Sequence, residues 1–188
     1  MSTIYYHTTA PEPSLCVREG NAWVRQPMEK YPERKHWFYA TVPDLRQFGC
    51  LDNREPGQSS NSFFAFTPGK YAVYKGRLVQ IKDTASPILL VADLDNTLVG
   101  TTQNMRQATS RFADFWLKHH YFSGSRLVYN TGRNYQLYLR LYEDGQDLLE
   151  PDMVVTGVGN TAYTIDPETG EYSEHPSFAD LYLSLIHI

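Results

Sequence analysis

The sequence predicts two domains, a small all-β sandwich followed by an α/β domain with a parallel sheet. Residues 3–82 contain several short extended segments separated by turn residues, and no convincing helical period. From residue 88 the pattern changes to apolar strands that alternate with amphipathic helices, which favours parallel strands joined by helical crossovers. The polar segment 83–87 is the predicted linker between the two domains.

Composition and charge exclude several classes of partner. The 188 residues carry a net charge of -4, and no cluster of lysine and arginine offers a footprint for nucleic acid. No stretch approaches the roughly 18 apolar residues that a membrane helix needs, so we expect no membrane partner. The start lacks a secretory signal pattern, so we expect a cytoplasmic protein, with a plastid as the alternative. Cys16 and Cys50 are too few for a disulfide framework, and we expect both to be reduced.

The first region contains short segments rich in aromatic or β-branched residues, which predict strands. These segments are residues 3–7, 22–25, 37–42, 63–66, 70–75 and 77–81. The last two flank Lys75-Gly76, where glycine tolerates the positive φ of a tight hairpin turn. Residues 49–61 are rich in Asp, Asn, Gly and Ser, which predicts a long loop, a common place for a binding site.

This first region resembles the starch-binding modules attached to starch synthases and amylases, which are small immunoglobulin-like β-sandwiches. The resemblance rests on the order of Tyr5-Tyr6, Ala22-Trp23, Pro27-Met28, Trp37–Val42 with Pro43, Asp52-Asn53, Ser60-Asn61 and Gly69-Lys70-Tyr71.

In such modules an exposed aromatic ring covers the apolar face of a sugar while amides bind its hydroxyl groups. The resemblance therefore implies that Trp23, Trp37 and Asn61 bind starch or another glucan. The alternative is that both tryptophans are core residues of the sandwich. Gln58-Ser59-Ser60-Asn61 also replaces the usual Trp-Asp-Asn-Asn of the family.

The second region begins with an acid pair after an apolar strand. Ile88-Leu89-Leu90-Val91 predicts a strand buried on both faces. Asp93 and Asp95 follow at its carboxyl end, where ligand sites form in open α/β sheets. Alternate residues of an extended segment share a side, so both carboxylates could reach one reacting group, with the Asn96-Thr97 turn bringing backbone N–H groups close. Paired carboxylates suit metal-assisted phosphoryl transfer, although Asp also favours ordinary turns.

A second polar cluster follows the next strand. An amphipathic helix is expected over residues 104–119, and the apolar strand 127–129 ends in Asn130-Thr131-Gly132-Arg133. Thr131 can hydrogen-bond a phosphoryl oxygen, Gly132 allows close backbone approach, and Arg133 can contact phosphate. The helix from Asn134 can also point its N-terminal amides at an anion. The alternative is an ordinary turn before an N-capping Asn134.

The remaining pattern completes the α/β alternation. Leu137, Leu141 and Leu148 give a second amphipathic pattern that ends by Pro151. A third strand is expected over residues 153–155. The glycine-rich turn 156–160 after it could line the substrate pocket, or serve only as a tight turn.

Residues 87–182 resemble the haloacid-dehalogenase superfamily of phosphatases and, within it, the sucrose-phosphate phosphatases. Residues 93–99, Asp-Leu-Asp-Asn-Thr-Leu-Val, are similar to the first superfamily motif, and residues 128–133, Val-Tyr-Asn-Thr-Gly-Arg, to the second. Residues 112–120, 137–141 and 149–159 match the sucrose-phosphatase pattern in order and spacing. The resemblance implies a Rossmann-like parallel sheet over residues 88–182, the N-terminal part of an incomplete haloacid-dehalogenase core.

The resemblance also implies a magnesium-dependent sugar-phosphate phosphatase, most like one that hydrolyses sucrose 6-phosphate. Asp93 would attack phosphorus and form an aspartyl-phosphate, and Asp95 would protonate the leaving sugar oxygen and then activate water. Mg²⁺ would lie on the Asp93 carboxylate and the Asp95 backbone carbonyl. Thr131 and Gly132, with Arg133 and Asn96, would bind the phosphate.

The chain departs from the superfamily pattern, because the later lysine and the second acidic pair of the metal site are absent from these residues. We therefore expect little phosphatase activity from residues 1–188, and a sheet that ends after three strands with an uncovered edge. Residues 183–188, Leu-Ser-Leu-Ile-His-Ile, match what a sequencing-library adapter would encode in frame, so we expect a non-native tail. The alternative function is a non-catalytic starch- or glucan-binding protein with a vestigial acid motif.

Overall fold

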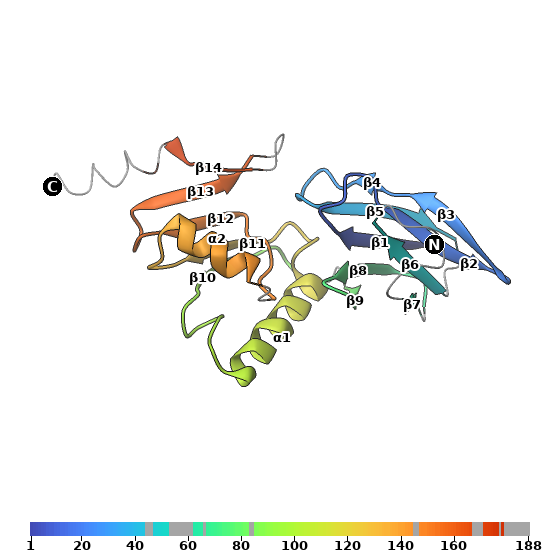
Figure 1. The fold of residues 1–188 in the computed structure, drawn as a ribbon, viewed down its shortest axis with the longest axis horizontal. Coiled ribbons are helices and arrows are strands. Elements are labelled where there is room, and N and C mark those ends of the chain that lie inside the picture. The colour runs from blue at the N-terminus through green and yellow to red at the C-terminus, as the bar shows by residue number, and fades with distance from the viewer. Residues whose placement is uncertain are drawn as a thin grey trace. The chain divides into compact units, whose positions relative to one another are not determined.

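The computed structural model describes residues 1–43, 47–52, 62–65, 67–82, 85–144, 147–166, 171–176 and 178. The chain divides into two compact units, Met1–Lys82 and Asp83–Ile188 (Figure 1). The tail expected over residues 183–188 lies outside the described residues. No helix in the described ranges is long and apolar enough to cross a membrane.

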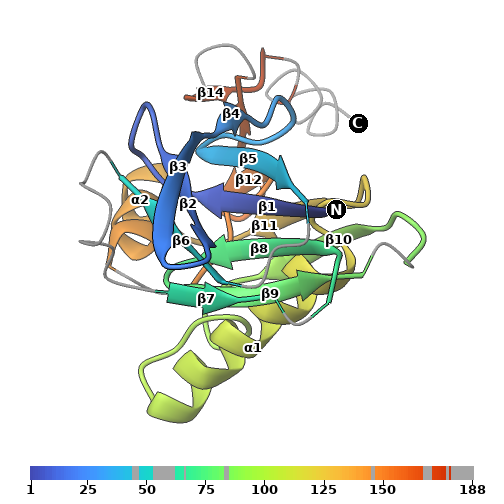
Figure 2. The same ribbon diagram turned by 90° about the vertical axis from the view of Figure 1, so that its right-hand side faces the viewer.

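The first unit is built from two sheets, with strand orders β4-β5-β1-β8-β9 and β3-β2-β6-β7. Figure 2 shows β5, β1, β8 and β9 side by side in the first of them. One apolar cluster joins the sheets, because Ile4 and Val73 of one pack with Leu15 and Phe48 of the other. The strands are β1 Ser2–His7, β2 Ser14–Glu19, β3 Ala22–Pro27, β4 Glu29–Lys30, β5 Trp37–Val42, β6 Gln47–Leu51, β7 Ser62–Phe64, β8 Lys70–Tyr74 and β9 Arg77–Ile81.

The strands predicted for this unit are present, with bounds that differ by at most two residues where the structure describes them. The predicted hairpin between β8 and β9 is also present, with positive φ at Lys75 (45°) and Gly76 (75°). The prediction of a loop from residue 49 is wrong for its first residues, because Gln47–Leu51 is a strand. It pairs with β2 and buries Phe48 completely, so core packing overrides the loop-like composition. Residues 53–61 lie outside the described residues.

The second unit contains one sheet of order β10-β11-β12-β13-β14. The first three strands pair in parallel, as predicted. The last two pair antiparallel, so the expectation of a sheet that ends after three strands is wrong. The elements are β10 Leu89–Asp93, α1 Gln103–His119, β11 Arg126–Asn130, α2 Tyr135–Glu143, β12 Met153–Thr156, β13 Thr161–Ile165 and β14 Tyr172–Glu174.

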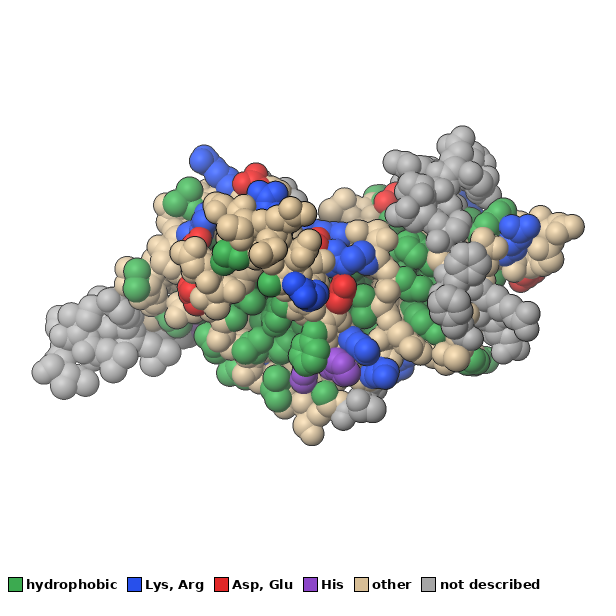
Figure 3. Space-filling view, turned by 90° about the horizontal axis from the view of Figure 1, so that it is seen from below, with side chains coloured by type: hydrophobic (Ala, Val, Ile, Leu, Met, Phe, Trp, Pro, Cys, Tyr) green, Lys and Arg blue, Asp and Glu red, His purple; other side chains and the backbone are tan. Residues whose placement is uncertain are grey.

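Strand β10 is an edge of the described sheet and pairs only with β11 there. Its side chains at Leu89 and Val91 are 67% and 56% exposed, so the prediction of a strand buried on both faces is wrong. They add to the hydrophobic surface of the protein, of which Figure 3 shows one face. The apolar run is suited to burial, but the described residues leave the face that carries Leu89 and Val91 largely uncovered.

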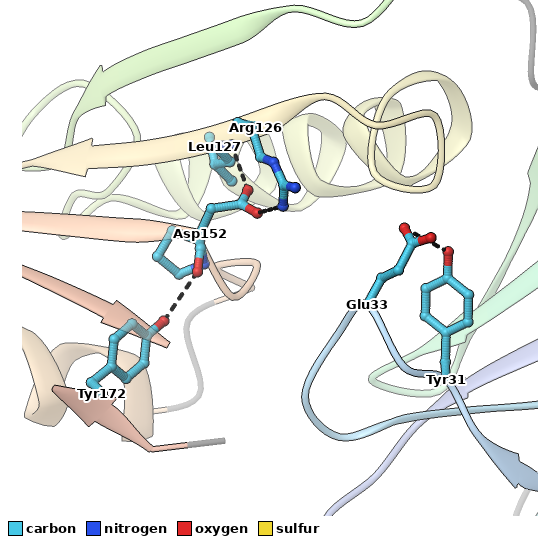
Figure 4. A network of polar contacts seen from close by, with 7 residues as sticks. Tyr31, Glu33, Arg126, Leu127, Asp152 and Tyr172 are labelled. Atoms are coloured by element: carbon cyan, nitrogen blue, oxygen red, sulfur yellow. Dashed lines mark hydrogen bonds and ion pairs between the residues drawn. The ribbon is translucent and has the colours of Figure 1, made fainter. Parts of the chain in front are cut away.

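The amino ends of β11 and β12 are tied together by Asp152 (Figure 4). Its Oδ1 accepts a 2.7 Å hydrogen bond from Nη1 of Arg126, and its Oδ2 accepts one of 2.8 Å from the Leu127 amide. The Tyr172 hydroxyl donates to the Pro151 carbonyl at 3.3 Å, which adds β14 to the same end. In the first unit, the Tyr31 hydroxyl in Figure 4 donates to Glu33.

Candidate active site

The two predicted polar clusters leave the same edge of the second sheet. Asp93 is the last residue of β10, Asn130 is the last residue of β11, and the two are partners in the parallel register. The turns that follow them therefore start side by side. The structure thus brings together the segments that carry Asp93, Asp95 and the Thr131–Arg133 turn.

The turn after β10 closes on the carbonyl of the fully buried Leu94. This oxygen accepts hydrogen bonds from the amides of Thr97 (3.2 Å), Leu98 (2.9 Å) and Val99 (2.8 Å), while the Asn96 amide donates to Val99 at 2.8 Å. The Asn96 and Thr97 amides are therefore used within the turn, and the expectation that they approach a ligand is not supported. Asn96 has a φ of 61°, a conformation that Asn tolerates well. Its side chain is exposed, so the side-chain amide is the group that could contact a phosphate.

The Asp93 carboxylate has one fixed and one available oxygen. Its Oδ2 accepts a 2.7 Å hydrogen bond from the Thr97 hydroxyl, whereas Oδ1 has no hydrogen-bond partner among the described residues. Asp93 is exposed, so Oδ1 is accessible to a reacting group. Sequence reasoning missed Thr97 as a site residue. Its position four residues after Asp93, within a tight turn, was the available signal.

Asp95 is held by Arg133 through a two-pronged ion pair. Nη2 of Arg133 lies 2.7 Å from Oδ1 of Asp95, and its Nε lies 3.1 Å from Oδ1 and 3.0 Å from Oδ2. These hydrogen bonds lower the pKa of the Asp95 carboxyl group, although partial burial acts in the opposite direction. Asp95 is thus stabilised as a carboxylate in this arrangement.

Thr131 and Gly132 occupy different environments. Thr131 is buried, and its hydroxyl accepts a hydrogen bond from the Arg133 amide at 3.2 Å. Gly132 is exposed, and a Cβ atom added there would meet no atom within 4 Å. Internal packing therefore does not require glycine at this position. Glycine would, however, allow a ligand to approach the backbone closely.

The glycine-rich turn after β12 supports the Thr131–Arg133 turn. The Gly157 amide donates to the Arg133 carbonyl at 2.9 Å, and the Val158 amide donates to the Thr131 carbonyl at 3.3 Å. Gly157, Val158 and Gly159 all have positive φ. This third polar turn, which could line the substrate pocket or serve only as a tight turn, is thus hydrogen-bonded to the second.

The oxygen donors at this edge fit a hard divalent cation. Oδ2 of Asp93 accepts one hydrogen bond and keeps a second lone pair for a cation, and the Asp95 carbonyl accepts none of the backbone hydrogen bonds that close the turn. Carboxylate and carbonyl oxygens are typical ligands of Mg²⁺, which keeps several waters or phosphate oxygens in its remaining positions. Asp93 and Asp95 are the residues that would hold Mg²⁺, through a side chain and a backbone carbonyl.

The candidate glucan-binding residues of the first unit differ in exposure. Trp37 is fully buried and stacks on Tyr74 with 6.0 Å between ring centroids. It offers no exposed ring face to a sugar, so the structure does not support it as a binding platform. Trp23 is half-buried on β3, and the Arg18 guanidinium lies 5.9 Å from its ring centroid. Asn61 lies outside the described residues.

The acid pair and the threonine-glycine turn lie together at the carboxyl edge of parallel strands in an α/β unit, where ligand sites form in such sheets. Residues 86–176 match the model of the family described as Sucrose-6F-phosphate phosphohydrolase. Two curated Arabidopsis thaliana proteins, "Probable sucrose-phosphatase 3a" and "Probable sucrose-phosphatase 3b", are 42% and 34% identical over 73 residues. The alignment covers 39% of this chain and 17% of each relative, so the chain spans only a small part of their length.

Two solved structures are also similar to parts of this chain. The sucrose-phosphatase of Synechocystis sp. PCC6803, determined with sucrose and phosphate, is 33% identical, covers 54% of this chain and 36% of its own, and has a TM-score of 0.39. A CBM25 module of a Bacillus halodurans amylase, determined with maltotetraose, is 19% identical over 43% of this chain and 96% of its own, with a TM-score of 0.33. The predicted resemblance of the second region to sucrose phosphatases is confirmed.

Proposed function

We propose that the second unit carries the phosphoryl-transfer residues of a magnesium-dependent sugar-phosphate phosphatase that acts most like a sucrose-6-phosphate hydrolase. The observation that supports this best is the placement of Asp93 and Asp95 beside the Thr131–Arg133 turn at one strand edge. This edge lies within the region that matches the sucrose-phosphatase family model. The sugar phosphate is a proposal drawn from that likeness.

The proposed reaction has two steps. Oδ1 of Asp93 attacks phosphorus, the bond to the sugar oxygen breaks, and an aspartyl-phosphate forms. Asp95 first takes up a proton from solvent and then delivers it to the leaving sugar oxygen. It then takes a proton from the water that attacks phosphorus and releases inorganic phosphate, which restores the Asp93 carboxylate. A bound Mg²⁺ would neutralise phosphate charge in both steps.

Phosphorylation of Asp93 tests this mechanism directly. The protein is incubated with Mg²⁺ and either sucrose 6-phosphate or acetyl phosphate, and mass spectrometry locates any phosphoryl group. We expect it on Asp93 in the wild type and no label in Asp93→Asn. The matched control is Asp144→Asn at the exposed C-cap of α2, which should be labelled like the wild type. A wild type that never becomes labelled on Asp93 would contradict the nucleophile assignment.

Phosphate release from sucrose 6-phosphate, measured in the same samples, tests turnover. The expectation that residues 1–188 have little activity alone stays a prediction. Labelling of Asp93 without release agrees with that prediction, whereas rapid release would show it to be wrong. Release that persists in Asp93→Asn would remove Asp93 from the mechanism.

A second candidate function is glucan binding by the first unit. It is favoured by Trp23, whose partly exposed ring lies on the β2–β3 hairpin beside Arg18. An exposed ring can stack on a sugar face. We expect the protein to be retarded on an amylose column and Trp23→Ala to elute earlier. Val24→Ala, a neighbouring exposed apolar position, is the control and should elute like the wild type. No retardation of the wild type would exclude this function.

A further inference from the structure

Arg133 adjoins two parts of the candidate site, the Asp95 carboxylate and the proposed phosphate-binding turn. Its guanidinium contacts both carboxylate oxygens of Asp95, at 2.7 to 3.1 Å. Its backbone belongs to the turn that we propose binds phosphate. One cationic side chain therefore adjoins both the proposed acid–base residue and the proposed phosphate position.

The backbone of Arg133 is fixed while its side chain is accessible. Its amide donates to the Thr131 hydroxyl at 3.2 Å, and its carbonyl accepts the Gly157 amide at 2.9 Å. The side chains of Arg133 and Asp95 are 32% and 42% exposed. A solvent-accessible ion pair is weak enough to exchange partners. The guanidinium can thus move about a fixed backbone position.

A phosphoryl group would compete well for this guanidinium. A phosphate dianion carries more charge than a carboxylate, and its oxygens match the planar fork of arginine in a two-pronged contact. The exposed Gly132 leaves the backbone beside Arg133 open to such a ligand. Asp95, in contrast, would repel the phosphate unless a cation screened it.

We propose that Arg133 is a positioning residue that exchanges its guanidinium between Asp95 and the phosphoryl group, so that phosphate binding releases the Asp95 side chain toward the leaving oxygen. This inference rests on the proposed function, since it needs phosphate at the Thr131–Arg133 turn. It couples substrate binding to acid–base catalysis. When Arg133 contacts the phosphoryl group, it no longer holds Asp95. Arg133 thus acts on the chemistry through Asp95.

A double-mutant cycle measures this exchange, with inorganic phosphate as the probe and calorimetry as the readout. The full chain is used at constant pH and ionic strength without added divalent metal. Asp95→Asn should tighten phosphate binding about tenfold, because it removes a negative charge and frees Arg133. In an Arg133→Gln background, the same change should tighten binding only about twofold, because charge removal alone remains.

Asp93→Asn is the matched control, since it removes a neighbouring negative charge that does not hold Arg133. It should change phosphate affinity by the same factor in both backgrounds. Arg133→Lys keeps the charge but loses the two-pronged contact, so the difference between backgrounds should take an intermediate value. Circular dichroism of each variant checks that it is folded, and Arg133→Lys replaces Arg133→Gln in the cycle if the latter does not fold.

Two results would overturn the proposal, and they are distinguishable. Equal effects of Asp95→Asn in both backgrounds would mean that Arg133 does not exchange partners, while the phosphate site itself would stand. Absence of phosphate binding in every variant would overturn both the exchange and the proposed phosphate site.

Discussion

The Thr97 hydroxyl donates a 2.7 Å hydrogen bond to Oδ2 of Asp93. Thr97 belongs to the turn that closes on the buried Leu94 carbonyl, so its position relative to the strand end is fixed. The bond restricts rotation of the Asp93 carboxylate and points the remaining oxygen, Oδ1, away from Thr97. In the proposed reaction, Thr97 therefore orients the nucleophile.

Replacing Thr97 by valine, which has nearly the same shape, should slow phosphorylation of Asp93 by about tenfold, because a hydrogen bond to a charged group is lost. Thr97→Ser keeps a hydroxyl and should retain most of the wild-type rate. The rate is followed by mass spectrometry with acetyl phosphate as donor. Equal rates for Thr97→Val and the wild type would show that the hydroxyl does not orient Asp93.

The location of the candidate site could be predicted from the sequence because parallel strands bring their carboxyl ends to one edge. The pairing of Asp93 with Asn130 follows from that rule, and it places Asp95 near Thr131. The contact between Arg133 and Asp95 could not be predicted, because it joins side chains 38 residues apart and depends on their rotamers. The Thr97–Asp93 hydrogen bond, in contrast, joins residues only four apart, and the tight turn after the strand was a signal for it.

Burial was harder to predict than strand position. Trp37 and Leu89 both lie in strands that the sequence indicated, yet Trp37 is fully buried and Leu89 is largely exposed. Strand patterning does not say which strand lies at a sheet edge or which ring faces the core. The three-residue β14 carries little periodic signal, whereas β13 was missed although it has five residues, as many as β10.

The Asn134 side chain caps α2 by accepting the Leu137 amide at 3.0 Å. Asn134→Ala removes this bond and should lower the free energy of unfolding by about 1 kcal/mol. Asn134→Asp keeps an acceptor and should be close to the wild type. Urea unfolding followed by circular dichroism measures both. A neutral Asn134→Ala would mean that the cap does not contribute to stability.

The exposure of Leu89 predicts that this position tolerates a charged residue, although it lies in an apolar strand. Leu89→Lys should change the free energy of unfolding by less than about 0.5 kcal/mol, because little apolar area is removed from the core. It should also reduce aggregation, since charge blocks pairing at an edge strand. Leu94→Ala, at a fully buried position, should cost about 2–5 kcal/mol. Urea unfolding and light scattering are the measurements. A large loss of stability in Leu89→Lys would indicate that this face is covered in solution.

Tyr6 should make the first unit sensitive to alkaline pH. Burial and the 3.0 Å hydrogen bond from its hydroxyl to Asp52 raise the pKa of Tyr6. The folded state therefore binds the phenolic proton more tightly than the unfolded state, whose tyrosine pKa is about 10. This contribution is complete below about pH 10 and is lost as the pH rises above it. The stability difference between the wild type and Tyr6→Phe should thus be largest near neutrality and shrink above pH 10. Urea midpoints across this range check it, and a constant difference would contradict it.

Val158 combines exposure with an unfavourable backbone conformation. Its side chain is 84% exposed and its φ is 62°, which is costly for a β-branched residue. The position is maintained by the bond from its amide to the Thr131 carbonyl, so the turn that supports the proposed phosphate site contains strain. Asparagine adopts this conformation more easily and would keep the amide hydrogen bond.

Val158→Asn should therefore raise the free energy of unfolding by about 1 kcal/mol, because strain is relieved while little buried apolar area is lost. Val24→Asn is the matched control, since Val24 is an exposed valine on an ordinary strand and its replacement should be neutral or slightly destabilising. Urea unfolding of both variants gives the comparison. If Val158→Asn destabilises as much as Val24→Asn, the turn is not strained at Val158, and the valine contributes contacts that its exposure does not reveal.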